Sequence, residues 1–381
     1  MALSRRDLTR RLLAMLPAGL LYRSGVDSDR GTAWRQEVDQ RSGRLSNLAA
    51  EGEIMTERIS LTSIEGLRVG HHTRDDRPTG CTVVLAEAGA VAGVDVRGAA
   101  PGTRETDLLR PQATVGKVHA ICLAGGSAFG LAAADGVMEF LRRRGVGFPT
   151  ANGPVPIVPA AILYDLGVGG GTSHPDADDG TAACAAASTV TPDEGNVGAG
   201  AGATVGKIFG TEYAMKGGIG SAGFRFADGT VVATLVAVNC RGDVRDPASG
   251  RLIAGARAAD GHSLRNSQAT LLAGAAGEPL GPSNTTIGVV ATNHTMDKSA
   301  CTHLAAIAHD GLARAVIPAH TRFDGDTFFF LATGTAGPID ASADDRLEAA
   351  VAASVSAAIL RAVRRARGLP GYPSASELGT G

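Results

Sequence analysis

The chain has 381 residues, of which 44% are apolar, enough to bury a large core in a soluble globular protein. A formal net charge of −2 and an aromatic content of 4% argue against nucleic acid or an anionic membrane as the main partner. No run of 18 apolar residues occurs, so no membrane-spanning helix is predicted.

The first 58 residues differ from the rest of the chain. They are rich in arginine and contain the single tryptophan, Trp34. Arg5-Arg6 followed by an apolar run resembles a twin-arginine export signal, but no clear cleavage site follows. We expect a disordered or non-native extension and a cytoplasmic protein, with export as the alternative; Met55 is a possible natural start.

The cysteines and histidines indicate no metal site. The five cysteines lie far apart, mostly in apolar runs, which is typical of buried free thiols in a reducing compartment: Cys81, Cys122, Cys184, Cys240 and Cys301. His303 and His309 are six residues apart and miss the spacing of a helical zinc site. No cofactor is implied.

From Ile59 a folded domain is expected to extend to the end of the chain. Residues 67–72, 81–86 and 92–98 read as three strands, and 120–123 as a fourth. A glycine-rich turn then leads into a helix that ends near Arg144. Ser127 lies in this turn, but the nucleophile-elbow pattern fails at Phe129, so a helix-capping role is predicted for Ser127.

The middle of the chain is dominated by glycine. Residues 201–208 and 218–223 come close to two nucleotide-binding motifs, but the first lacks the required residues and the second continues as a strand. Both therefore favour turns and closely packed strands. Residues 231–240 form the strongest predicted strand, and 242–281 a polar connector with a helix-like patch at 254–259.

After the connector the pattern is strand (285–292), helix (299–315), strand (326–333) and helix (344–367). In the last helix, apolar residues recur every four positions, which predicts a stripe facing the core: Leu347, Val351, Val355 and Ile359.

Thr285 stands where a polar turn becomes the first of these strands. If the chain were cut between Asn284 and Thr285, this threonine would carry a hydroxyl and a free α-amine, whose reference pKa near 8 suits a general base. Ordinary β-propensity also explains a threonine here.

Several of these segments resemble the self-cleaving family of β-aminopeptidases and nylon-oligomer hydrolases. The resemblance covers residues 61–367 and is carried by Asn284-Thr285-Thr286-Ile287, the strand end at 290–293, the segment 323–327 and the loop 99–107. The Asn-Thr junction resembles the nylon-oligomer branch. The loop 99–107 also fits a solvated surface turn.

The resemblance implies a set of site residues. Thr285 is the implied nucleophile and Asn284–Thr285 the bond cut by the protein itself; Asp324 and Asp326 match the paired carboxylates, and Lys207, Asn239 and Tyr164 match residues that line the centre. Two aspartates at i and i+2 of an extended segment point to the same face and can converge on one centre. An Asp-Gly turn, a surface lysine and a turn asparagine are the ordinary alternatives.

The same resemblance implies a four-layer αββα sandwich related to the Ntn hydrolases, in one domain over residues 59–381 divided at Asn284, assembled as a homotetramer. It also implies an amide hydrolase acting on oligomers of ω-amino acids. Three alternatives remain open: a β-aminopeptidase-type peptidase, an acetyltransferase of the same superfamily, and an uncleaved binding protein without catalysis.

Overall fold

The computed structural model describes residues 58–278, 281, 284–339 and 344–381. The extension predicted for residues 1–58 lies outside these ranges, apart from Arg58, as do Pro282 and Ser283 of the turn predicted before Thr285. Residues 58–381 form one compact unit. None of the helices in the described ranges is long and apolar enough to cross a bilayer.

Nine strands of the described chain are joined by hydrogen bonds: eight follow one another in the order β3-β5-β4-β2-β14-β12-β9-β8, and β1 pairs with β2 outside this path. Their bounds are β1 (Arg68–Thr73), β2 (Gly80–Val96), β3 (Thr103–Arg104), β4 (Val118–Ala124), β5 (Ala160–Ile162), β8 (Gly218–Arg225), β9 (Val231–Asn239), β12 (Thr285–Thr292) and β14 (Thr327–Ala332).

Strand β2 belongs to two sheets. Its first half pairs with β1 and β4, and its second half pairs with β14. Two separate strands were predicted here, and this prediction was wrong. The register of the β2–β4 pair shifts between Leu85 and Ala90, and Gly89 has a φ of 81°. A glycine at positive φ lets the strand bend at a bulge without ending.

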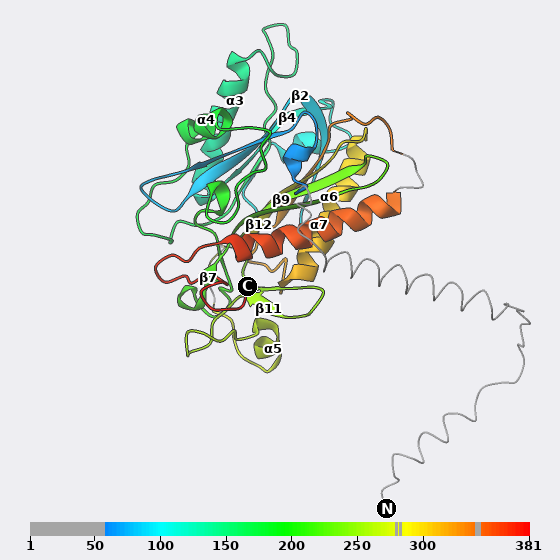
Figure 1. The fold of residues 1–381 in the computed structure, drawn as a ribbon. Helices are drawn as coiled ribbons and strands as arrows, with labels where there is room; N and C mark the ends of the chain where they lie inside the picture. Colours follow the sequence, from blue (N-terminus) through cyan, green and yellow to red (C-terminus); the bar gives the residue numbers. More distant parts are fainter. Residues whose placement is uncertain (1–57, 279–280, 282–283, 340–343) are drawn as a thin grey trace, which may run out of the picture. The chain divides into compact units, whose positions relative to one another are not determined.

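Helices cover the two outer faces, which gives four layers, α-β-β-α (Figure 1). Their bounds are α3 (Ala133–Arg143), α4 (Ala177–Ala185), α6 (Lys298–Ala315) and α7 (Asp344–Arg365). Helices α3 and α4 pack on the half with β4, and α6 and α7 pack on the half with β9, β12 and β14. The predicted αββα fold is confirmed.

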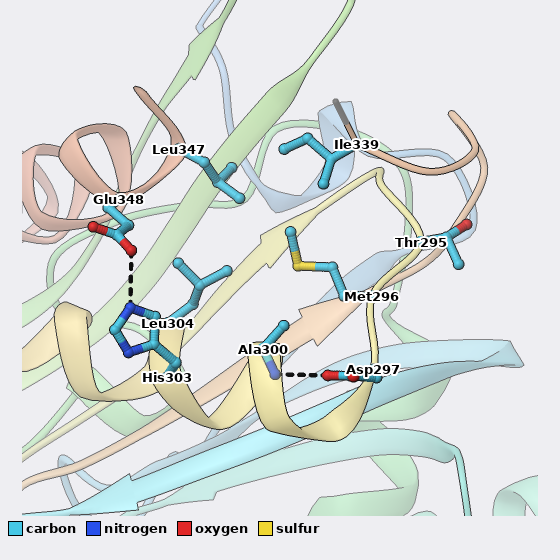
Figure 2. Close-up of a pocket in the computed structure, with 9 residues that line it drawn as sticks. All are labelled: Thr295, Met296, Asp297, Ala300, His303, Leu304, Ile339, Leu347 and Glu348. Atoms are coloured by element: carbon cyan, nitrogen blue, oxygen red, sulfur yellow. Dashed lines mark hydrogen bonds and ion pairs between the residues drawn. The ribbon is translucent and has the colours of Figure 1, made fainter. Parts of the chain in front are cut away.

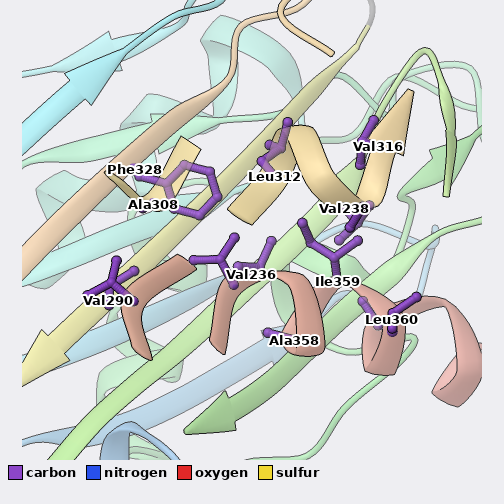
Figure 3. Packing of buried hydrophobic residues seen from close by; sticks show 14 of the residues in the cluster. Val236, Val238, Val290, Ala308, Leu312, Val316, Phe328, Ala358, Ile359 and Leu360 are labelled. Carbon is purple, nitrogen blue, oxygen red and sulfur yellow. The ribbon is translucent and has the colours of Figure 1, made fainter. Parts of the chain in front are cut away.

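The face under α6 and α7 shows why the continuous apolar strands and the four-residue stripe of the last helix were predicted correctly. Val236, Val290 and Phe328 point from three neighbouring strands toward Leu312 and Ile359 of the helices (Figure 3). The predicted stripe of α7 is buried. Burying such side chains stabilises the fold by about 1.5–3 kcal/mol each.

The glycine-rich segment at 218–223 is strand β8, as predicted. A Cβ at Gly220 would come within 2.2 Å of the Ala358 carbonyl oxygen in α7. Glycine is therefore needed here for the helix to approach the sheet. This close packing explains the glycine pattern of residues 218–223 without a bound nucleotide.

The turn after β4 differs from its prediction. Gly126, with a φ of 82°, occupies the N-cap position of the 3₁₀ turn Ser127–Ala132 that precedes α3, and no side chain caps it. The capping role predicted for Ser127 was therefore wrong, because a left-handed glycine terminates the preceding strand here.

The connector after β9 is built from β10 (Asp243–Arg245), β11 (Leu252–Ala254) and α5 (Ser267–Leu272), and β13 (Val316–Ile317) completes their small sheet. The short strands β6 (Thr204–Val205) and β7 (Met215–Lys216) come before β8 in the chain and pair with each other.

The helix predicted at 254–259 is absent from this described segment. Asp243 is buried and accepts hydrogen bonds from the backbone N–H of Ala256 at 2.9 Å and from the hydroxyl of Ser267 at 2.7 Å. A buried carboxylate that needs donors holds this segment extended, against its local helical preference.

Candidate active site

Thr285 is the first residue of β12, between β9 and β14, and is 4% exposed. Strand β9 is antiparallel to β12, so its last residue, Asn239, lies directly opposite Thr285. Strand β14 is parallel to β12, so the residues that enter β14, Asp324 to Asp326, lie beside Asn284 and Thr285. Sheet topology therefore gathers these residues at one end of the central strands.

The peptide group between Asn284 and Thr285 is held on both sides. The Thr285 hydroxyl donates a short hydrogen bond to the carbonyl oxygen of Asn284, and the backbone N–H of Gly325 donates to the same oxygen at 3.0 Å. A Cβ on Gly325 would lie 2.9 Å from Thr285 Oγ1 and 2.6 Å from the Ala100 carbonyl oxygen. Only glycine fits this position without displacing its neighbours.

The two aspartates face this peptide in different ways. Asp326 Oδ1 accepts the backbone N–H of Thr286 at 2.8 Å. Asp324 Oδ2 accepts the backbone N–H and the hydroxyl of Thr321, at 2.8 and 2.6 Å. Its Oδ1 is buried and has no hydrogen-bonding partner among the described residues.

The electrostatics of this pair favour a proton on Asp324. Burial raises the pKa of Asp324, and the neighbouring charge of Asp326 raises it further, against the opposing effects of the Thr321 hydrogen bonds and of Lys207. Both aspartates are buried. Asp324 thus holds a proton to higher pH than an ordinary aspartate and is suited to proton transfer.

Lys207 and Asn239 form a second part of the cluster. Lys207 Nζ donates to the side-chain oxygen of Asn239 at 2.8 Å and to its backbone carbonyl at 3.0 Å. Burial lowers the pKa of Lys207 to about 7, and nearby groups that include Asp324 partly oppose this effect. Lys207 is therefore an interior lysine, contrary to the ordinary alternative of a surface lysine.

Tyr164 joins the cluster through its main chain. Its carbonyl oxygen accepts the side-chain N–H of Asn239 at 3.0 Å, while its own side chain is 37% exposed. The structure thus places the other predicted residues at one end of the central strands or in contact with a residue there, and links Tyr164 to Asn239 by its backbone: Asn284, Thr285, Asp324, Asp326, Lys207 and Asn239.

Three residues near the centre were missed from the sequence: Gly325, His320 and Thr321. His320 Nδ1 contacts Asp326 Oδ2 at 2.9 Å, as Thr321 contacts Asp324. The signal was a His-Thr pair within six residues of two aspartates. Its meaning depends on the loop folding back on itself, which sequence spacing does not encode.

The loop at 99–107 packs against the two aspartates. The backbone N–H of Ala100 donates to the Asp324 carbonyl oxygen at 2.9 Å, and that of Arg97 to the Asp326 carbonyl oxygen at 3.0 Å. The start of this loop therefore supports the Asp324–Asp326 turn.

A cavity of about 280 Å³ lies beyond the other end of β12, where α6 and α7 begin (Figure 2). Met296, Leu304 and Leu347 line it together with His303, whose Nε2 lies 2.8 Å from Glu348 Oε1. None of the residues gathered around Thr285 lines it, so it is separate from the candidate active site.

Comparison with known proteins gives matches over most of the chain. The model of peptidase family S58 matches residues 60–376. An uncharacterised aminopeptidase of Mycobacterium tuberculosis is 45% identical over 325 residues, 80% of this chain and 92% of that protein. A 6-aminohexanoate-oligomer endohydrolase of Kocuria sp. is 32% identical over 272 residues, 70% of this chain and 73% of that protein.

Two solved structures share the fold. A β-aminopeptidase of Burkholderia sp. superimposes with a TM-score of 0.61 at 25% identity, over 81% of this chain and 86% of that one. The L-aminopeptidase D-Ala-esterase/amidase of Ochrobactrum anthropi, a variant of the Ntn hydrolase fold, gives a TM-score of 0.63 at 19% identity, over 84% and 92%.

Proposed function

This chain belongs to peptidase family S58 and is a hydrolase of amide bonds, and we propose that it becomes active by cutting its own Asn284–Thr285 bond. The observation that carries the proposal is the contact of the Thr285 hydroxyl with the Asn284 carbonyl oxygen, to which the Gly325 N–H also donates. A nucleophile and an oxyanion donor on one buried peptide bond are what an acyl shift requires.

The cleavage proceeds in two steps. Thr285 Oγ1 attacks the carbonyl carbon of Asn284, the C–N bond breaks, and an ester joins Asn284 to the threonine side chain. The proton leaves the hydroxyl and reaches the departing nitrogen; Asp324, whose pKa is raised by burial, is suited to carry it. Water then hydrolyses the ester, which leaves a carboxylate on Asn284 and a free amine on Thr285.

The same groups serve turnover. The Thr285 amine takes the proton of its own hydroxyl, and Oγ1 attacks the substrate amide to form an acyl-enzyme while the amine product leaves. The Gly325 N–H, released from the Asn284 carbonyl, donates to the oxyanion of the substrate. Lys207, with a pKa of about 7, stabilises charge beside Asn239. Water releases the acid.

For the substrate we propose short amides with ω-amino or β-amino acid units. The relative named as an oligomer endohydrolase favours internal amide bonds of such oligomers. The higher identity to proteins named aminopeptidases favours removal of amino-terminal residues instead. Cleavage of an oligomer of 6-aminohexanoate whose amino terminus is acetylated separates the two, because an aminopeptidase needs the free amine.

Two alternatives are separated from hydrolysis by the products. An acetyltransferase of the same superfamily would pass the acyl group to an added amine, so the acylated amine would outweigh the free acid. An uncleaved binding protein would release no product. We also propose a homotetramer of cleaved chains in the cytoplasm, which light scattering and cell fractionation test.

The test of the central proposal is intact-mass spectrometry of the denatured protein. We expect one fragment ending at Asn284 and another beginning at Thr285, and we expect Thr285→Ala to remain intact and inactive. Thr285→Ser, which keeps the hydroxyl, serves as the matched control and should be cut. An unbroken wild-type chain with full amidase activity would overturn the proposal.

A further inference from the structure

His320 lies in the loop between β13 and β14 and contacts Asp326 through two nitrogen atoms. Its ring Nδ1 is 2.9 Å and its backbone N is 3.2 Å from Asp326 Oδ2. The residue holds this position with a φ of 54°, a conformation that few residues other than glycine and asparagine adopt readily. The backbone is thus turned so that ring and N–H reach the same oxygen.

The other oxygen of this carboxylate faces the nucleophile's strand. Asp326 Oδ1 accepts the backbone N–H of Thr286, the neighbour of Thr285. His320 therefore holds Oδ2 of Asp326, while Oδ1 of the same carboxylate faces the strand that carries Thr285.

A second histidine, His309 of α6, backs the ring of His320. The two ring centroids are 4.8 Å apart at an interplanar angle of 64°, and His309 also meets the ring of Phe328 edge-on. His309 is completely buried, and its Nε2 lies 3.0 Å from the carbonyl oxygen of Asp95. Since a carbonyl only accepts, Nε2 carries the proton.

Each ring retains one nitrogen that is buried and has no hydrogen-bonding partner among the described residues: Nδ1 of His309 and Nε2 of His320. Burial lowers the pKa of His309 to about 4, so His309 is neutral at neutral pH and its Nδ1 is a bare acceptor. His309 therefore backs the ring of His320 as an uncharged group.

We propose that His320, backed by His309, is the positioning residue of Asp326: its ring and its backbone N–H hold Oδ2, so that Oδ1 faces the strand of Thr285. This inference rests on the proposed function, because the carboxylate that His320 holds serves the Thr285 centre. The charged and titratable groups around the pair are Asp326 and Asp324 from the same loop, Asp95 from β2, and Lys207, which acts on Asp324.

Two substitutions test the positioning role. Asparagine keeps an N–H donor near the place of Nδ1 and tolerates the left-handed backbone. Glycine keeps the backbone and removes the side chain. We expect His320→Gly to lower kcat about 10- to 100-fold with little change in KM, since one hydrogen bond to a charged group is lost.

We expect His320→Asn to keep most of kcat, because its amide N–H takes the place of Nδ1. His303→Asn, on the exposed side of α6, is the matched control and should leave kcat unchanged. His309→Gln keeps a donor for the Asp95 carbonyl but removes the ring behind His320, and should lower kcat by less than His320→Gly does.

Intact-mass spectrometry of each variant precedes the kinetics. An uncut wild-type chain contradicts the proposed function. Normal cleavage together with a wild-type kcat in His320→Gly overturns this inference alone, and so does a kcat of His320→Asn as low as that of His320→Gly. A folded but uncut His320→Gly beside a normally cut His320→Asn supports positioning, because the same carboxylate then serves cleavage.

Discussion

The backbone N–H of Gly325 and the carbonyl oxygen of Asn284 are 3.0 Å apart, across the junction of two parallel strands. This hydrogen bond polarises the one peptide group that the Thr285 hydroxyl also contacts. It thus links the pairing of β12 with β14 to the proposed self-cleavage.

Gly325→Ala tests this link. The added methyl group would lie 2.9 Å from Thr285 Oγ1 and 2.6 Å from the Ala100 oxygen, both in a packed turn. We expect self-cleavage to slow about 100- to 1,000-fold, the usual effect of losing an oxyanion donor. The rate is measured by the appearance of the Thr285 fragment in mass spectrometry. Gly116→Ala, where nothing lies within 4 Å, should cleave normally.

Asp324→Asn tests the proton carrier. Asparagine has the same shape, and its oxygen still accepts both donors of Thr321, so the fold should persist. Because an amide cannot carry the proton, we expect cleavage about 100-fold slower or more. Circular dichroism checks that the fold persists, and the time course of the Thr285 fragment measures the rate of cleavage. A variant that cuts at the wild-type rate would remove Asp324 from the mechanism.

Lys207→Met tests the burial of an ammonium group. The folded pKa of about 7 lies below the ordinary 10.5 of lysine, so charging this residue penalises the folded state fully below pH 7. The penalty declines by about 1.4 kcal/mol per pH unit as the pH rises toward 10.5. Methionine does not have this penalty.

The stability of Lys207→Met relative to lysine should therefore fall as the pH rises from 7 to 10. Urea unfolding at several pH values measures it, with both chains carrying Thr285→Ala so that a single polypeptide unfolds. The exposed Lys117→Met provides the control and should show no such slope. A pH-independent difference for Lys207→Met would mean that the lysine is solvated.

Asp165→Asn tests the ion pair that supports the Tyr164 backbone. Asp165 and Arg77 are both buried, with Oδ1 and Nη2 2.7 Å apart, and Arg77 also donates to the Asp165 and Leu166 carbonyls. Removing one partner leaves the other charge buried and unpaired. We therefore expect the free energy of unfolding, measured in urea, to fall by about 3–5 kcal/mol. Asp76→Asn, whose side chain pairs with Arg74 at the surface, should leave the free energy of unfolding almost unchanged.

Much of the fold was predictable because it rests on local patterns. The strands β9, β12 and β14 and the helices α6 and α7 were placed within a few residues, because continuous apolar runs indicate strands buried on both faces and four-residue periodicity indicates the buried face of a helix. The errors fall where a distant partner overrides local preference, as Asp243 does for residues 254–259.

The sequence by itself determined which residue types stand at Asn284-Thr285 and at Asp324 and Asp326, and so pointed to the chemistry. Only the tertiary structure decided that Asn239 lies opposite Thr285, that Lys207 is interior, that Tyr164 joins by its backbone, and that Gly325 and His320 belong to the site. The physical reason is that strand register and loop closure bring together residues far apart in the chain, and no local periodicity records those pairings.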